Sequence, residues 1–107
     1  MNLHVRIIAK KTLVKFYAKH NAARASLEAW YNEVVEQNWG MPSDVIKLYR
    51  TADVITGKRL VFNIKGNAYR LIADIEFNLK IVFIFWVGTH AEYDKVKVEG
   101  VKYVKGN

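Results

Sequence analysis

The chain has 107 residues, which is enough for one domain with a single hydrophobic core. Hydrophobic residues make up 51% of it and charged residues 25%, a composition that excludes an intrinsically disordered chain. The absence of cysteine excludes disulfides, thiolate catalysis and cysteine-zinc sites, and 17 basic against 10 acidic residues give a net charge of +7.

The positive charge favours a polyanionic partner, with RNA or DNA first and an acidic protein second. A basic surface that serves only solubility would give the same balance. The first residues contain too short an apolar run for a signal peptide, and no run approaches the roughly 20 apolar residues of a transmembrane helix. We therefore expect a cytoplasmic protein that does not associate with a membrane.

The first part of the chain predicts a strand and two helices. Apolar and polar residues alternate over Leu3–Ile8, which is typical of a strand, and the apolar period becomes helical over Lys10–His20. A second helical pattern covers Ala22–Asn38. We expect it to end there, because Gly40 suits the left-handed cap position and Pro42 cannot continue a helix.

The middle of the chain predicts three strands joined by tight turns, after a connector over residues 43–52 that is either wholly irregular or contains one helical turn. Gly and Asn in Lys65-Gly66-Asn67, and Asn78 before Leu79, are residues that tolerate the positive φ of hairpin turns. The last of the three strands is apolar on both faces, which is typical of a central strand covered on both sides. The predicted strands are Arg59–Ile64, Tyr69–Phe77 and Ile81–Val87.

The order β-α-α-β-β-β predicts a single α+β domain over residues 1–107. Two amphipathic helices cannot bury their apolar stripes against each other alone, so we expect both to pack on one face of a twisted, mainly antiparallel sheet. The other face is expected to be open, concave and basic. Residues 98–107, rich in valine and lysine, form either a short extra strand or a flexible tail.

Basic residues gather where the chain enters this sheet. Between residues 45 and 70 the only acid is Asp53. The basic residues of the same stretch are Lys47, Arg50, Lys58, Arg59, Lys65 and Arg70.

Titratable side chains follow the apolar strand directly, and they suggest a chemistry. His90, Tyr93 and Lys95 come after the strand, and Arg70 lies early in the strand before it. Metal-free cleavage of RNA needs a base for the 2′-hydroxyl, a cation for the phosphorane and an acid for the leaving 5′-oxygen. Histidine titrates near neutrality and serves either proton role. A His-x-x-Tyr after a strand also occurs by chance, so the pattern alone leaves a ribonuclease and a purely structural reading open.

Two longer motifs resemble those of the HigB group of toxins from bacterial toxin–antitoxin modules, within the larger RelE/ParE superfamily. The N-terminal strand and two helices also fit, so the resemblance covers nearly the whole chain, while the tail after Lys97 departs from the family pattern. The motifs are Lys65-Gly66-Asn67-x-Tyr69-Arg70-Leu71-Ile72 and Thr89-His90-x-Glu92-Tyr93-Asp94.

The resemblance implies a RelE-like fold and an endoribonuclease that cleaves mRNA, usually on the ribosome, without a metal or other cofactor. It also implies a cognate, HigA-like antitoxin with a helix-turn-helix DNA-binding domain. By this resemblance Arg70 binds and neutralises the scissile phosphate, His90 is the general acid or base, and Tyr93 assists by hydrogen bonding or stacking.

The resemblance and the charge together imply an RNA-binding set around these three residues. Lys65 and Asn67 match the hairpin motif and are expected to position the RNA backbone. Lys95 is the last residue of the segment that carries the resemblance, whereas Lys58 and Arg59 are included for their charge rather than for a matched motif.

Two other functions fit the same chain. One is a ParE-like inhibitor of DNA gyrase, which binds a protein and performs no hydrolysis. The other is a non-catalytic RNA-binding module that uses Tyr69, Trp86 and a basic face for stacking and charge. The presence of His90 and Tyr93 with Arg70 favours the nuclease.

Overall fold

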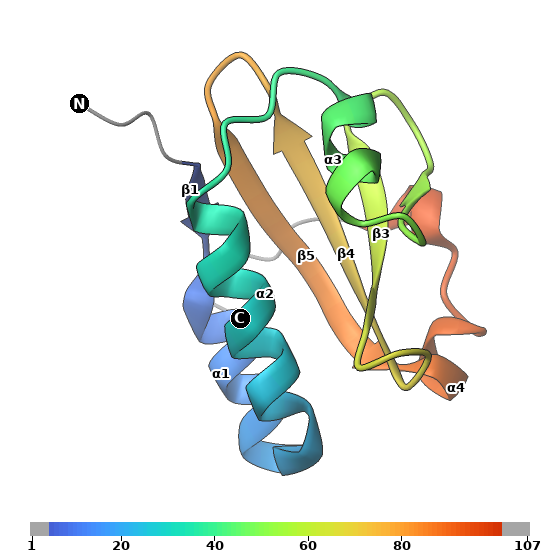
Figure 1. The fold of residues 1–107 in the computed structure, drawn as a ribbon. Coiled ribbons are helices and arrows are strands. Elements are labelled where there is room, and N and C mark those ends of the chain that lie inside the picture. Colours follow the sequence, from blue (N-terminus) through green and yellow to red (C-terminus); the bar gives the residue numbers. More distant parts are fainter. Residues whose placement is uncertain (1–4, 102–107) are drawn as a thin grey trace.

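The structure is a computed structural model in which residues 5–101 are described (Figure 1). Strands and helices follow in an α+β order, with short 3-10 helices at two places. In chain order the elements are β1 (Arg6–Ile8), α1 (Lys10–Lys19), η1 (Asn21–Ala23), α2 (Arg24–Val35), α3 (Pro42–Leu48), β2 (Asp53–Val54), β3 (Arg59–Ile64), β4 (Tyr69–Glu76), β5 (Ile81–Thr89), α4 (His90–Tyr93) and η2 (Val98–Gly100).

One five-stranded sheet, in the order β1-β5-β4-β3-β2, forms the centre of the fold. β1 pairs with β5 in parallel, and the three other pairs are antiparallel. The predicted α+β class and mainly antiparallel sheet are therefore confirmed. β5 lies between two partners, as its two apolar faces indicated. The described part of the first strand is Arg6–Ile8, and residues 1–4 lie outside the described range.

The larger core lies between the sheet and the helices. α1 and α2 contact each other, and Figure 1 shows them side by side along the sheet. Their apolar stripes belong to one buried cluster with residues of β3, β4 and β5. The helices contribute Leu13, Tyr17, Leu27, Trp30 and Val34 to it. None of the helices within residues 5–101 is long and apolar enough to cross a membrane.

The second face of the sheet is covered, so the prediction of an open basic face is wrong. Val61 and Ile72 on this face are 2% and 0% exposed. The segment after α4 runs back along this side (Figure 1), and Arg59 Nη1 donates to the carbonyl oxygens of Val98 and Glu99 at 3.0 and 3.2 Å. Burial of an aliphatic side chain stabilises a fold by about 1.5–3 kcal/mol, which favours this covering.

The covering segment settles part of the prediction for the tail. Val98–Gly100 form a 3-10 turn and not a strand, and this turn is fastened by the Arg59 guanidinium. Residues 102–107 lie outside the described range.

The connection between α2 and the sheet differs from the prediction. α2 ends at Val35, and Gly40 does not cap it. Pro42 begins a new helix, α3, because its missing N–H and fixed φ suit the first helical position. The Asp44 carboxylate accepts a hydrogen bond from the Gly40 N–H at 2.9 Å and steadies this entry. The predicted connector is thus largely helical, and β2 after it was not predicted.

The two predicted turns of the central hairpins occur, as residues 65–68 and 77–80. The first has φ of 54° at Lys65 and 62° at Gly66. Gly66 adopts this left-handed conformation without steric cost. In the second turn the left-handed residue is Lys80, with φ 57°, rather than Asn78 or Leu79.

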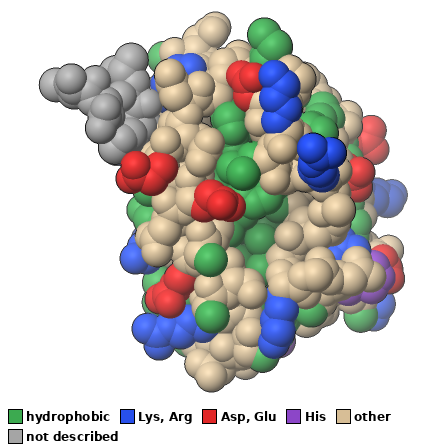
Figure 2. Space-filling view, viewed as in Figure 1, with side chains coloured by type: hydrophobic (Ala, Val, Ile, Leu, Met, Phe, Trp, Pro, Cys, Tyr) green, Lys and Arg blue, Asp and Glu red, His purple; other side chains and the backbone are tan. Residues whose placement is uncertain are grey.

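The surface over the helices carries mixed charge. Figure 2 shows Lys and Arg interspersed with Asp and Glu on this face, around a hollow of hydrophobic side chains. A pocket of about 250 Å³ opens between α2, α3 and β3, with Trp30, Glu33 and Tyr49 among its lining residues. This face therefore offers no single cationic surface to a polyanion.

Candidate active site

The candidate site is built where β5 ends and α4 begins, and the start of α4 is fixed by a capping box. The Glu92 N–H donates to Thr89 Oγ1 at 3.1 Å, and the Thr89 N–H donates to Glu92 Oε1 at 2.8 Å. The N–H of His90 also donates to the carbonyl oxygen of Ala68 at 2.9 Å. These bonds satisfy donors that a helix start would otherwise leave free, and they fasten α4 to the β3–β4 turn.

The β3–β4 turn holds the guanidinium of Arg70 in place. Nη1 donates to the carbonyl oxygens of Asn67 and Tyr69, each at 3.2 Å, and Nη2 donates to Asn67 Oδ1 at 2.5 Å. Its central carbon lies 5.8 Å from the centre of the Tyr93 ring. All these partners are neutral. The Nε–H and one Nη2–H have no protein partner within residues 5–101, so they are the donors that could reach a phosphate oxygen.

Two buried arginines on the same face differ in how their charge is balanced. Arg59 is 8% exposed and Arg70 is 9% exposed. Arg59 forms a two-bond ion pair with Asp74, at 2.6 and 3.1 Å. Arg70 has no ion pair with any described residue. A buried cation without a counter-charge is unfavourable in the free protein, and it is therefore ready to bind an anion.

Tyr93 lies between Arg70 and Trp86. Its ring centre is 6.1 Å from that of Trp86. Burial raises the pKa of the Tyr93 phenol above its usual value; the carboxylates of Asp53 and Asp94 raise it further, whereas Arg70 lowers it. The phenol therefore stays protonated at neutral pH, and it is suited to donate a proton or a hydrogen bond.

His90 is the first residue of α4, three positions before Tyr93. Its Nδ1 is buried and has no hydrogen-bond partner among the described residues. Nε2 lies 3.8 Å from Asp94 Oδ2, and the side chain is 45% exposed. Nε2 is thus the ring nitrogen that a substrate could reach, and the Asp94 carboxylate is its charged neighbour.

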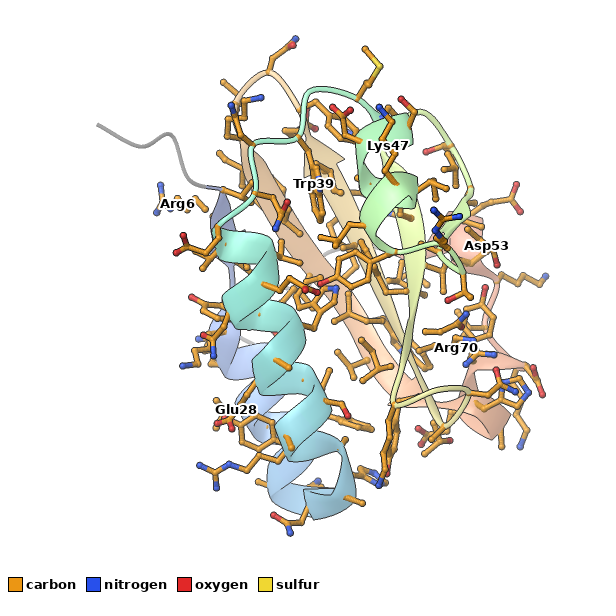
Figure 3. The ribbon with its side chains drawn as sticks, viewed as in Figure 1. Arg6, Glu28, Trp39, Lys47, Asp53 and Arg70 are labelled. Carbon is orange, nitrogen blue, oxygen red and sulfur yellow. The ribbon has the colours of Figure 1, made fainter. Side chains whose placement is uncertain are left out.

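The structure brings Arg70, His90 and Tyr93 to one end of the sheet. Arg70 on β4 is the cross-strand partner of Gly88 on β5, two residues before His90. Figure 1 shows α4 beside the β3–β4 turn, and Figure 3 shows Arg70 on the side of the molecule away from Glu28. The three residues thus lie at the same end of the sheet, and their joint role in catalysis stays a prediction.

The five predicted RNA-binding residues do not all lie at this site. Asn67 is part of it through Arg70, and Lys95 lines the neighbouring pocket beside α4. Lys65 points toward the helices, because its Nζ donates to the carbonyl oxygen of Ala22 at 3.3 Å.

The other two lie at the far end of the β3–β4 pair. The Arg59–Asp74 pair lies four positions along the strands from the Asn63–Arg70 pair, a distance of about 13 Å. Lys58 Nζ binds Glu76 at 3.0 Å, and this hydrogen bond raises the pKa of the Lys58 ammonium. Arg59 is engaged with Asp74. Contact of either with RNA stays a prediction.

Two features of the site were not recognised in the sequence. The Thr89-x-x-Glu92 spacing is a capping-box signature, and it could have predicted a helix start at His90. Asp53 was noted only as an isolated acid, yet its carboxylate acts on Tyr93 and Figure 3 shows it on the same side as Arg70. Nothing in the spacing of Asp53 could have shown this, because β2 reaches the site only through its pairing with β3.

The arrangement can hold an anion and move protons next to it. Arg70 supplies the positive charge, His90 a proton acceptor and Tyr93 a proton donor, all on short segments fastened to the sheet. Among residues 5–101 there is no group of three or more His, Asp or Glu side chains that could hold a metal ion.

A comparison with protein-family models identifies the family of the chain. The model of a family described as HigB_toxin, the RelE-like toxic component of a toxin–antitoxin system, matches residues 23–96, which is more than half of the chain. The match includes α2 and α3, all strands from β2 to β5, and α4. A search of curated proteins gave no significant match.

Proposed function

The chain belongs to the HigB family of RelE-like toxins, and from this premise we propose that it is an endoribonuclease that cleaves mRNA at the ribosome without a metal ion. Membership makes it the toxic component of a toxin–antitoxin system, which implies an antitoxin partner. The proposal adds the RNA cleavage, the cytoplasmic location, a HigA-like helix-turn-helix antitoxin and a RelE-like placement of α1 and α2 over one face of the sheet.

The observation that carries the proposal is that the buried Arg70 guanidinium forms no ion pair with any residue in the described range. Its cross-strand neighbours Asn63 and Gly88 are uncharged, whereas the equivalent neighbour of Arg59 is Asp74. A phosphodiester that reaches the two Arg70 donors without a partner within residues 5–101 would supply a negative charge beside the guanidinium. The interaction strengthens when the phosphorane forms, because a second negative charge develops there.

His90 and Tyr93 supply the proton transfers that this cleavage needs. His90 Nε2 takes the proton from the 2′-hydroxyl, whose oxygen then attacks phosphorus. The P–O5′ bond breaks, and the protonated Tyr93 phenol donates to the leaving 5′-oxygen. The products are a cyclic 2′,3′-phosphate and a free 5′-hydroxyl.

The remaining contacts in the proposal follow the RNA away from the scissile phosphate. Asn67 binds Arg70 through its side chain and keeps the guanidinium in place. Lys95 lies beside α4 and attracts the backbone. Lys65 adds its charge from a distance, since its Nζ binds the Ala22 carbonyl oxygen on the helix side. Lys58 and Arg59 act at most at long range, since their charges are balanced by Glu76 and Asp74.

Primer extension on cellular mRNA after induction of the protein tests the proposal. We expect discrete new 5′ ends that carry a hydroxyl, and no such ends with His90→Gln or Arg70→Ala. Growth arrest without new ends, together with loss of gyrase supercoiling, would replace the nuclease with the ParE-like function. Growth arrest that both substitutions leave unchanged would also contradict the proposal.

A further inference from the structure

A second concave site adjoins the candidate active site. It is a pocket of about 360 Å³ that lies between the end of α1, the second half of β5 and the segment around α4. β1 pairs only with residues 81–83 of β5, so α1 rather than a strand flanks the rest of this edge. The residues that line the pocket are Phe16, Lys19, His20, Trp86, Val87, Glu92, Lys95 and Val96.

Aromatic rings form two sides of this pocket. On the α1 side, Phe16 and His20 are stacked, with ring centres 4.4 Å apart and planes 18° apart, and Tyr69 meets Phe16 edge-on at 5.7 Å. On the β5 side, the Trp86 indole lies across Gly88. A Cβ at Gly88 would come within 2.3 Å of the Trp86 ring, so only glycine permits this position of the indole.

Trp86 connects the pocket to the candidate active site. Its ring is 6.1 Å from that of Tyr93, which in turn lies against Arg70. Along β5, Trp86 is two residues from Gly88, the cross-strand partner of Arg70, a separation of about 7 Å. A chain whose phosphate is held by Arg70 can therefore place an adjacent group on the indole.

Charged groups stand around these rings. Lys19 and Lys95 bring two ammonium groups to the pocket, and Glu92 brings a carboxylate. Glu92 Oε1 already accepts the Thr89 N–H, but a carboxylate has further acceptor positions. Aromatic surfaces between basic side chains are the usual means of binding unpaired bases, and the carboxylate can accept from the exocyclic amine of adenine, cytosine or guanine.

We propose that this pocket binds one unpaired nucleobase of the RNA, stacked on Trp86 beside the phosphate held by Arg70. The volume is at the lower end of the range for ligand pockets, which suits a single base rather than a larger ligand. The inference rests on the proposed function for its substrate class. It adds a residue, Trp86, that sets where on the RNA the protein binds.

Binding to an uncleavable RNA tests this inference separately from cleavage. The probe is a short mRNA segment with a 2′-deoxy nucleotide at the scissile position, compared with versions in which each base in turn is removed to leave an abasic site. Affinity for the free toxin is measured by fluorescence anisotropy. We expect Trp86→Ala to weaken binding by roughly 5- to 150-fold, the range found for loss of one stacked base, and Trp86→Phe to weaken it much less.

The decisive result is coupling between Trp86 and one base. At a single position, removal of the base should weaken binding to the native protein and have almost no further effect in Trp86→Ala. If the two losses add at every position, the pocket does not bind a base and the inference is wrong. If the coupling is present but the all-ribose RNA is never cleaved, the proposed nuclease function fails while the base-binding pocket stands.

A matched pair of lysines checks the charge around the pocket. Lys19→Gln removes a cation that lines it, and Lys11→Gln removes one at the start of the same helix, about 12 Å away along the axis. We expect Lys19→Gln to weaken binding severalfold and Lys11→Gln to leave it near the native value. Equal effects of the two would contradict a local role for Lys19.

Discussion

The two buried arginines should respond in opposite ways to the same substitution. Arg59→Gln leaves the Asp74 carboxylate buried without its partner, a change that typically costs 3–5 kcal/mol of unfolding free energy. Arg70→Gln removes a cation that forms no ion pair with any described residue. The substitution loses the three hydrogen bonds of the guanidinium, each of which contributes about 0.5–1.5 kcal/mol to stability. It also removes the cost of burying a charge, which is about as large as these three contributions together, so the two effects nearly cancel. We therefore expect Arg70→Gln to stay within about 1 kcal/mol of the native protein.

Thermal and urea unfolding, followed by circular dichroism, measure this contrast. At about 4 °C per kcal/mol for a domain of this size, Arg59→Gln should lower Tm by about 12–20 °C and Arg70→Gln by no more than about 4 °C. On RNA the order should reverse. Arg70→Gln should lose about 10²–10³-fold in kcat/KM, the cost of removing one donor to a developing oxyanion, while Arg59→Gln, assayed where it is folded, keeps its activity. Equal losses of stability in the two variants would refute the idea that Arg70 is held without a counter-charge.

Three further predictions concern the cap, the pH and the salt. Thr89→Val removes the capping hydroxyl and frees the start of α4, so it should lower the unfolding free energy by about 1 kcal/mol and abolish most of the RNA cleavage. Thr89→Ser keeps the hydroxyl and should keep cleavage. Equal cleavage by Thr89→Val and the native protein would contradict this prediction. Burial, and then the hydrogen bond with the Glu33 carboxylate, raise the pKa of the Tyr49 phenol. The unfolded chain then loses this proton first, so stability should fall as pH rises above about 10, and urea titrations from pH 9 to 11 should show a smaller fall in Tyr49→Phe. The affinity for single-stranded RNA should fall as salt is added, and a plot of log affinity against log salt concentration should fall by about 0.7 per phosphate contact. Lys95→Gln should make this slope shallower. Lys58→Gln should leave it unchanged, because Lys58 is already paired with Glu76 in the native protein.

Periodicity was sufficient for the elements that lie in the core. The strand patterns beginning at Arg59, Tyr69 and Ile81 and the helical pattern from Lys10 predicted β3, β4, β5 and α1 almost to the residue, because each buries one face in a single cluster. The hydrophobic pattern did not predict the helix boundaries near Pro42, because these depend on capping residues. Pro42 can end one helix or begin another, and only the chain around it selects the second.

The covering of the second face could not be read from the sequence for a different reason. The alternation in β4 showed that Ile72 shares a face with Arg70, but it did not show what lies over that face. The segment that covers it is short, mixed in charge and without a period of its own, and it is fastened through backbone carbonyl oxygens at Val98 and Glu99. Any sequence can supply carbonyl oxygens, so no residue pattern marks this contact.

The same limit explains why the site could be located but its arginines could not be told apart. Arg59 and Arg70 each stand near the start of a strand, among apolar neighbours and close to a turn, and both were assigned to RNA. What separates them is the register of the sheet, which places Asp74 opposite Arg59 but Asn63 and Gly88 opposite Arg70. A shift of one residue in either pairing would turn these side chains to opposite faces and remove the distinction. The readiness of this fold to bind an anion therefore depends on the alignment of β3, β4 and β5, and not on the number of basic residues in the chain.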